Sequence, residues 1–240
     1  MNEEMLPVAI LAGGLATRLM PLTTDLPKAL LDVNGEPFIA HQLRLLRANA
    51  ITRVVVCVGY RGEMVQAFVG DGARFGLQVT FTFDHPRLLG TAGAIQNALS
   101  FLGDAFFVLY GDSYLPCDYC AVQSAFRSSG KLALMTVFRN EGRWDRSNIE
   151  FADGEIIVYD KRDRSPRMHH IDYGFGVFAR AAFDIVPDGQ PYDLADVYQH
   201  WLQQKQLAVL EIGERFYEIG SPEGLEETRR YLSAPSEKTE

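Results

Sequence analysis

The sequence predicts an α/β protein with a mixed, mostly parallel sheet that is flanked by helices. Two observations support this fold class. Short apolar runs alternate with segments of helical periodicity through the first half of the chain, and this alternation indicates right-handed βαβ units. The run at residues 105–110 is almost continuously apolar, as expected for a strand that is covered on both faces.

Each element of the first half follows from a local pattern. An apolar run at 8–11 predicts a strand that ends in a glycine-rich turn, and Ile39, Leu43 and Leu46 stand at helical spacing. The segment at 91–99 reads as a helix behind a glycine. We therefore expect strands at 8–11, 53–58, 77–83 and 105–110, and helices at 38–48, 63–68 and 91–99.

The pattern changes after Gly130. Strand-like segments follow one another, and Asp153-Gly154 between two of them is a strong hairpin turn. No linker rich in Pro, Gly or Ser separates the two halves, so we expect one domain over 1–233 whose halves meet near residue 130, and a disordered polar tail over 234–240. The expected elements are strands at 131–138, 149–151, 155–159 and 171–178, and helices at 194–203 and 222–232.

Composition excludes several classes of protein. The chain has 240 residues, of which 47% are apolar, and a net charge of −8, so it has enough residues for a substantial core but no overall basic surface for nucleic acid. No apolar run is long enough to span a bilayer, and the N-terminus lacks the layout of a signal peptide. We expect a cytoplasmic protein that has neither a membrane nor a nucleic-acid partner. Three cysteines do not form a disulfide framework.

The turn after the first strand has the composition of a phosphate-binding loop. Ala12-Gly13-Gly14 follows the apolar run directly, and glycines without a Cβ let backbone N–H groups approach phosphate oxygens. Arg18 and Lys28 come next and could neutralise a polyphosphate. The segment lacks the Gly-Lys-Ser/Thr ending of a P-loop and the glycine spacing of a dinucleotide site.

Two further candidate sites also follow predicted strands, and ligands of open α/β sheets bind beyond the carboxyl ends of strands. Residues 89–93, Leu-Gly-Thr-Ala-Gly, open a helix and could contact a base or ribose through Gly90 and Thr91. Gly111-Asp112 follows the strand at 105–110, where a carboxylate is well placed to hold Mg²⁺ against phosphates. The convergence of three such sites predicts a nucleotide pocket.

These motifs resemble a known family. Residues 11–19 and Pro27-Lys28 are similar to the signature Leu-Ala-Gly-Gly-x-Gly-Thr-Arg-Leu…Pro-Lys of the sugar-1-phosphate nucleotidyltransferases, with Ala16 in place of a glycine. Residues 89–94 resemble the nucleoside-recognition segment found in guanylyltransferases for mannose or heptose 1-phosphates. Gly111-Asp112 looks like the metal-binding motif of the family. The resemblance implies a GT-A-like fold, with a Rossmann-like nucleotide-binding half over about 1–130 and a sugar-binding half over 131–233 on the same sheet.

Three motifs of the second half extend the resemblance, with departures. Residues 159–161 resemble the Val-Glu-Lys element whose lysine meets the sugar phosphate, and residues 171–174 resemble the Asn-Ala-Gly segment that contacts the sugar. Residues 216–222 look like the late Trp-x-Asp-x-Gly-Thr-Pro motif, but Glu218 replaces its metal-binding aspartate. Asp160, Asp172 and Tyr173 also differ from the usual residues.

The resemblance implies direct nucleotidyl transfer, in which a sugar 1-phosphate attacks the α-phosphorus of an NTP and pyrophosphate leaves. It assigns Arg18 to the β- and γ-phosphates, Lys28 to the α-phosphate and Lys161 to the attacking phosphate. Asp112 and Glu218 would hold Mg²⁺, and Asp172 and Gly174 would bind the sugar phosphate substrate with Lys161. The expected nucleotide-binding residues are Leu11, Ala12, Gly13, Gly14, Thr17, His85, Gly90 and Thr91.

Several functional alternatives stay open at this point. GTP with a manno- or heptose-type sugar 1-phosphate is the first expectation. The others are a uridylyltransferase for an amino-sugar or muramic acid 1-phosphate, a cytidylyltransferase for a non-sugar phosphate, and a non-catalytic subunit that binds nucleotide sugars and assembles with an active paralogue. The intact set of Arg18, Lys28 and Asp112 argues against the last alternative. The partners are therefore an NTP and a sugar 1-phosphate, and a homo-oligomer is left open.

Overall fold

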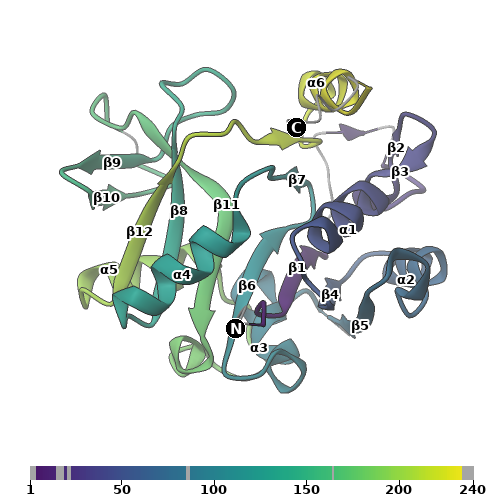
Figure 1. The fold of residues 1–240 in the computed structure, drawn as a ribbon, viewed down its shortest axis with the longest axis horizontal. Coiled ribbons are helices and arrows are strands. Elements are labelled where there is room, and N and C mark those ends of the chain that lie inside the picture. The colour runs from purple at the N-terminus through teal and green to yellow at the C-terminus, as the bar shows by residue number, and fades with distance from the viewer. Residues whose placement is uncertain (1–3, 15–18, 21–22, 85–86, 164, 234–240) are drawn as a thin grey trace.

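The computed structural model describes residues 4–14, 19–20, 23–84, 87–163 and 165–233 (Figure 1). Within them, a nine-stranded sheet runs in the order β10-β9-β11-β6-β1-β4-β5, with β8 paired to β11 and β12 paired to β8. The expected tail at 234–240 lies outside the described residues. In chain order the strands are β1 (Val8–Ala12), β4 (Arg53–Val58), β5 (Gln78–Phe83), β6 (Ala105–Tyr110), β8 (Ala133–Arg139), β9 (Ile149–Ala152), β10 (Glu155–Tyr159), β11 (His170–Ala179) and β12 (Leu207–Ile212).

Strand direction divides the sheet. The strands β5, β4, β1 and β6 are parallel neighbours, and β8 and β12 also pair in parallel. Between these groups β11 runs antiparallel to both β6 and β8. The sheet is therefore mixed and mostly parallel, as the sequence predicts, and the four parallel carboxyl ends of the first half meet at one edge.

Helices cover both faces of the sheet because neighbouring residues of a strand point to opposite sides. In β1, Val8 and Ile10 pack into one core cluster with α1 (Phe38–Ala48), α2 (Gly62–Val69) and α4 (Tyr119–Ser129). Ala9 packs into the other, with α3 (Gly90–Leu102) and α5 (Leu194–Gln203). Figure 1 views the sheet from the α1 and α4 side.

A short two-stranded ribbon joins the middle of the chain to its last part. Its strands β7 (Ser113–Tyr114) and β13 (Tyr217–Glu218) pair antiparallel, and α6 (Pro222–Ser233) follows directly. A third core cluster joins α6 to strand β2 (Asp32–Val33) through Val33, Ile219 and Leu225 among others. Strand β2 pairs antiparallel with β3 (Glu36–Pro37). Three single turns of 3₁₀-helix complete the described elements, at Lys28–Leu30, Ala73–Phe75 and Arg180–Phe183.

Most elements lie where the sequence predicts them. The elements α1, β4, β6, β10 and α5 match their predicted bounds, and the other expected elements differ at their ends by one to three residues. Helix α4, strand β12 and the two-residue strands β2, β3, β7 and β13 were not predicted. Helix α4 is capped by Asp118, which accepts a hydrogen bond from the Ala121 N–H at 3.0 Å. The helix was missed because its Cys, Gln and Ser residues interrupt the helical spacing of apolar residues. Strand β12 was overlooked although Leu207–Ile212 is a mostly apolar run; it pairs with β8, with Leu207 opposite Ala133.

No described helix is both long and apolar enough to cross a membrane.

Candidate active site

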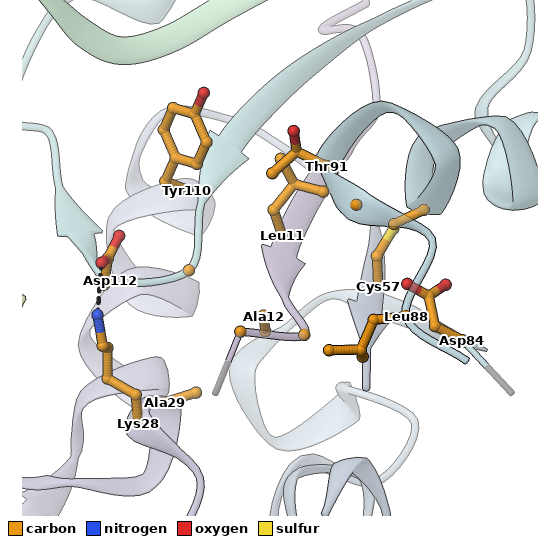
Figure 2. A pocket seen from close by; sticks show the side chains of 15 residues that line it. Leu11, Ala12, Lys28, Ala29, Cys57, Asp84, Leu88, Thr91, Tyr110 and Asp112 are labelled. Carbon is orange, nitrogen blue, oxygen red and sulfur yellow. Dashed lines mark hydrogen bonds and ion pairs between the residues drawn. The ribbon is translucent and has the colours of Figure 1, made fainter. Parts of the chain in front are cut away.

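The carboxyl ends of the parallel strands border a cavity of about 270 Å³ (Figure 2). Gly111 at the end of β6 lets this strand lie close to β1, because a Cβ there would lie 2.6 Å from the Leu11 oxygen. Tyr110, Asp84 and Leu88 also line the cavity. Of the expected site residues, the structure brings together Leu11, Ala12, Gly13, Gly14, Lys28, Gly90, Thr91 and Asp112 around it.

Lys28 and Asp112 form an ion pair at one end of this cavity. The Lys28 Nζ lies 2.7 Å from the Asp112 Oδ2, and the two side chains are 17% and 28% exposed. Lys28 begins a 3₁₀ turn after Pro27, while Asp112 stands between β6 and β7. A cation and a carboxylate of this kind are what a polyphosphate–metal complex requires.

Glu218 reaches the same place through the β7–β13 ribbon. It pairs with Ser113 in that ribbon, and the Ile219 N–H donates to the Asp112 carbonyl oxygen at 2.9 Å. A Cβ placed on Gly220 would lie 3.5 Å from the Glu218 Oε1 and 3.7 Å from the Asp112 Oδ2. Both carboxylates therefore face Gly220 from nearby positions.

This donor set fits Mg²⁺, because that ion takes one or two carboxylates and completes its octahedron with water and phosphate oxygens. In the described part of the chain, no group of three or more His, Cys, Asp or Glu is placed to hold a metal ion. The protein's share of a metal site here would be two carboxylates, Asp112 and Glu218.

A second cavity, of about 280 Å³, adjoins the first and shares Tyr110 and Asp112 with it. Lys161, Asp172, Gly174 and Glu218 also line it, so the residues expected for the sugar phosphate come together here.

Lys161 is held inside the second cavity by two oxygens. Its Nζ lies 3.4 Å from the Asp172 Oδ2 and donates to the Tyr110 hydroxyl at 3.3 Å. Burial lowers the pKa of the Lys161 ammonium, but the Tyr110 and Asp172 oxygens outweigh it, and the net result is a pKa above the ordinary lysine value. Burial also raises the pKa of Tyr110 to about 12. At neutral pH the pair is therefore an ammonium ion beside a neutral phenol.

A bulge in β11 aims Asp172 at this cavity. The register against β8 shifts between Asp172 and Gly176, and Gly174 has a φ of +89°, a conformation that favours glycine. The Gly174 N–H donates to the Asp172 Oδ1 at 3.0 Å, and the Tyr159 hydroxyl donates to the Asp172 Oδ2 at 3.2 Å. Both carboxylate oxygens are thus fixed by the protein, and Asp172 orients Lys161.

The segment around Gly90 is shaped by the chain that precedes α5. Gly90 has a φ of +70°, and a Cβ there would lie 2.6 Å from the Tyr192 oxygen. The Thr91 hydroxyl donates to the Asp193 Oδ1 at 3.2 Å and accepts from the Leu194 N–H at 2.7 Å. The Ala92 N–H, in the first turn of α3, donates to the Tyr192 oxygen at 3.0 Å. Any contact of Gly90 or Thr91 with a nucleotide would therefore involve atoms of these residues that do not take part in these hydrogen bonds.

Asp84 and Cys57 are cavity residues that the sequence analysis did not select. Asp84 is the first residue after β5, and its Oδ2 accepts a hydrogen bond from the Leu89 N–H at 3.2 Å. The rule that found Asp112, a carboxylate just beyond an apolar strand, could have found it. Figure 2 shows both residues across the cavity from Lys28. Burial raises the pKa of the Cys57 thiol to about 12, so Cys57 stays protonated and is not a nucleophile.

Three expected site residues, Thr17, Arg18 and His85, lie outside the described residues.

Comparison with known proteins places the chain in a family. A model of the nucleotidyl transferase family matches residues 8–149. The chain belongs to this family. The chain is 36% identical, over 83% of its length and 86% of the relative's, to an N-acetylmuramate alpha-1-phosphate uridylyltransferase of Neisseria meningitidis serogroup B. It is 30% identical, over 79% of its length and 53% of the relative's, to a mannose-1-phosphate guanylyltransferase of Mycobacterium tuberculosis.

The chain spans about half the length of several curated relatives that it matches. Among solved structures, a putative glucose-1-phosphate thymidylyltransferase from Bacillus anthracis superimposes with a TM-score of 0.84 at 22% identity, over 95% of this chain and 96% of the other. That likeness supports the expected GT-A-like, Rossmann-type fold.

Proposed function

We propose that this nucleotidyl transferase joins a nucleoside monophosphate to a sugar 1-phosphate. An oxygen of the sugar phosphate attacks the α-phosphorus of an NTP, the bond from that phosphorus to the bridging oxygen breaks, and pyrophosphate leaves with the bond electrons. One observation carries the proposal: a glycine-rich nucleotide cavity and a lysine-containing cavity meet at Tyr110 and Asp112. Two phosphorylated substrates bound there would place their phosphates side by side.

Catalysis by these residues would rest on alignment and charge, with no protein nucleophile. Lys28 lies at the phosphate end of the first cavity and would contact the α-phosphate. Lys161 lies in the second cavity and would hold the attacking phosphate in line, because Asp172 and Tyr110 fix its ammonium group. Backbone N–H groups of Gly13 and Gly14 would pack against the nucleotide. Arg18 follows that loop in the sequence and would contact the leaving phosphates.

Asp112 and Glu218 are the residues that would hold Mg²⁺. When bound, the ion supplies positive charge that offsets the charge developing on the phosphate oxygens. Lys28 pairs with Asp112 in the structure described here. The same lysine would turn to a phosphate oxygen once a nucleotide is present, because the phosphate then offers the more concentrated negative charge.

The nucleotide is first proposed to be GTP, with a manno- or heptose-type acceptor. Two observations support this choice. The relative from Mycobacterium tuberculosis is named as a mannose-1-phosphate guanylyltransferase. Asp84 lines the end of the cavity away from Lys28 (Figure 2), and a carboxylate accepts hydrogen bonds, which suits the adjacent N–H donors of guanine.

A second candidate pair is UTP with a muramic acid 1-phosphate. It is favoured by the uridylyltransferase from Neisseria meningitidis, which has the higher identity of the two relatives and matches this chain over most of both lengths.

Pyrophosphate release tests both pairs at once. Each of the four NTPs is combined with glucose, mannose, heptose and N-acetylmuramic acid 1-phosphates in the presence of Mg²⁺. Release that requires GTP and a manno-type acceptor supports the first pair, and release that requires UTP and the muramic acid derivative supports the second. Binding of nucleotide without release for any pair would reject the transferase proposal and favour a non-catalytic subunit.

A further inference from the structure

The segment between β8 and β9 enters the second cavity, although no role has been assigned to it. It contributes Asp145, Arg146 and Asn148 to the lining, beside Lys161 and Asp172. Both Asp145 and Arg146 are exposed, whereas Asn148 is 6% exposed. A nearly buried amide side chain at the wall of a polar cavity calls for a hydrogen-bond partner on each of its two ends.

Asn148 connects three parts of this cavity. Its backbone N–H donates to the His170 oxygen, and its backbone oxygen accepts from the Asp160 N–H, both at 3.0 Å. Its side-chain Oδ1 accepts from the Asp172 N–H at 3.0 Å. The residue therefore links the start of β9 to the neighbour of Lys161 and to the bulge of β11.

These bonds leave one end of the amide available. Because Oδ1 is the end that meets a backbone donor, the orientation of the amide is set, and Nδ2 with its two N–H groups must point elsewhere. No described residue accepts a hydrogen bond from Nδ2. The Nδ2 atom is also not enclosed by protein, since it is absent from the fully buried side-chain atoms without partners.

The rest of the segment is anchored independently of the cavity. The Asn140 Nδ2 donates to the Asp145 oxygen at 2.6 Å and to the Ser147 Oγ at 3.2 Å. The Ser147 Oγ also accepts from the Gly142 N–H at 3.1 Å. This preorganisation holds Asn148 in place before any ligand arrives, so its amide is available at little entropic cost.

We infer that Asn148 binds the acceptor substrate. Its Nδ2 donates a hydrogen bond to an oxygen of the sugar 1-phosphate, while its Oδ1 keeps Asp172 and, through it, Lys161 in position. The inference rests on the proposed function, because it takes the second cavity as the acceptor site. It makes Asn148 a specificity-determining residue that contacts only one of the two substrates.

The test compares three variants. Asn148→Ser removes Nδ2 but leaves a neutral oxygen for the Asp172 N–H, and Asn148→Asp replaces the donor with a negatively charged oxygen. Ser147→Ala is the matched control, because it loosens the same segment without touching the cavity. Calorimetry measures the Kd of glucose, mannose and N-acetylmuramic acid 1-phosphates and of the four NTPs, and thermal unfolding reports the fold. The tightest-binding acceptor and NTP are then followed.

We expect both Asn148 variants to weaken acceptor binding about tenfold or more, because the hydrogen bond from Nδ2 to the substrate is lost. Asn148→Asp should weaken it the more strongly, because its negative charge repels the phosphorylated acceptor. The Kd of the NTP should stay within twofold for each variant, and Ser147→Ala should keep the wild-type acceptor Kd while lowering Tm. Asn148→Ser is neutral and keeps the inference testable if Asn148→Asp does not fold.

Wild-type acceptor affinity in Asn148→Ser would overturn the inference, and so would an equal loss in Ser147→Ala, which would mean that only the order of the segment matters. A wild-type protein that binds NTP but none of the sugar 1-phosphates would instead reject the proposed function, and the inference with it.

Discussion

Replacing Lys28 with methionine tests the charge at the centre of the proposed site. In the structure the Lys28 ammonium lies 2.7 Å from the Asp112 carboxylate, and most of both side chains is shielded from water. Methionine keeps the length and apolar stem of lysine and removes only the charge. Two quantities should respond: the free energy of unfolding, because Asp112 loses its partner, and the turnover number, because a phosphate loses its cation.

The structure sets the size of the first effect. At 2.7 Å and an effective dielectric constant of about 20, Coulomb attraction is roughly 6 kcal/mol. Desolvation and side-chain ordering offset most of it, and partial exposure lets water solvate the Asp112 left behind, so we expect a loss of about 1–2 kcal/mol in the free energy of unfolding. For a domain of this size that lowers Tm by about 2–8 °C.

The effect on turnover should be larger. Removing one preorganised group that stabilises the negative charge developing in the transition state typically lowers kcat by about 10²–10³-fold. We therefore expect Lys28→Met to stay folded at 25 °C and to lose about that factor in kcat for pyrophosphate release at saturating concentrations of both substrates.

Lys131→Met provides the control, because the Lys131 Nζ donates a hydrogen bond to the Leu207 oxygen at 3.0 Å and the residue lines neither proposed substrate cavity. It should keep wild-type kcat. A Lys28→Met enzyme whose kcat lies within threefold of the wild type, with native Tm and circular dichroism, would refute the argument that Lys28 stabilises the reacting phosphate.

Further predictions concern the two cavities. Asp112→Asn should lower kcat at least 10²-fold and raise the Mg²⁺ concentration for half-maximal activity, and chelation of Mg²⁺ with EDTA should abolish wild-type turnover; kinetics at graded Mg²⁺ check both. Lys161→Ala should raise the KM of the acceptor at least tenfold and leave the KM of the NTP unchanged, because Lys161 lies in the second cavity. Gly90→Ala should lower Tm by several degrees, since its Cβ would lie 2.6 Å from the Tyr192 oxygen and strain of this kind costs about 1–3 kcal/mol. The folded-state pKa of Lys161 is raised. Its attraction to Asp172 is therefore fully present below the ordinary lysine pKa of about 10.4, and it is lost only as the pH rises through the higher folded value. We therefore expect the acceptor KM to stay flat from about pH 7 to 9.5, as KM measured across that range would show.

Different outcomes would contradict each of these. Normal activity of Asp112→Asn at low Mg²⁺ would remove the carboxylate from the metal site. A rise in the KM of the NTP alone would mean that Lys161 contacts the NTP and not the acceptor. Gly90→Ala with unchanged Tm would mean that the segment before α5 can move away, and an acceptor KM that climbs below pH 9 would mean that another group titrates.

Local patterns in the sequence determined much of the fold. Alternation and helical spacing placed α1, β4 and β6 at their observed bounds, because side-chain periodicity reflects which face of an element is buried. Position just beyond β6 and β1 then selected Asp112 and the Gly13–Gly14 turn as candidates. The same rule applied to β5 would have identified Asp84, which was overlooked.

Tertiary structure decided how remote segments meet. Glu218 reaches Asp112 only because β13 pairs with β7. The Thr91 hydroxyl bonds to the start of α5, 102 residues later in the chain. Asn148 was recognised as a cavity residue only from the structure, in which its Oδ1 accepts a hydrogen bond from the Asp172 N–H. The sequence by itself determined which residues lie at strand ends, because that depends on neighbours in the chain. It did not determine which ends converge, because that depends on strand order and register across the whole sheet.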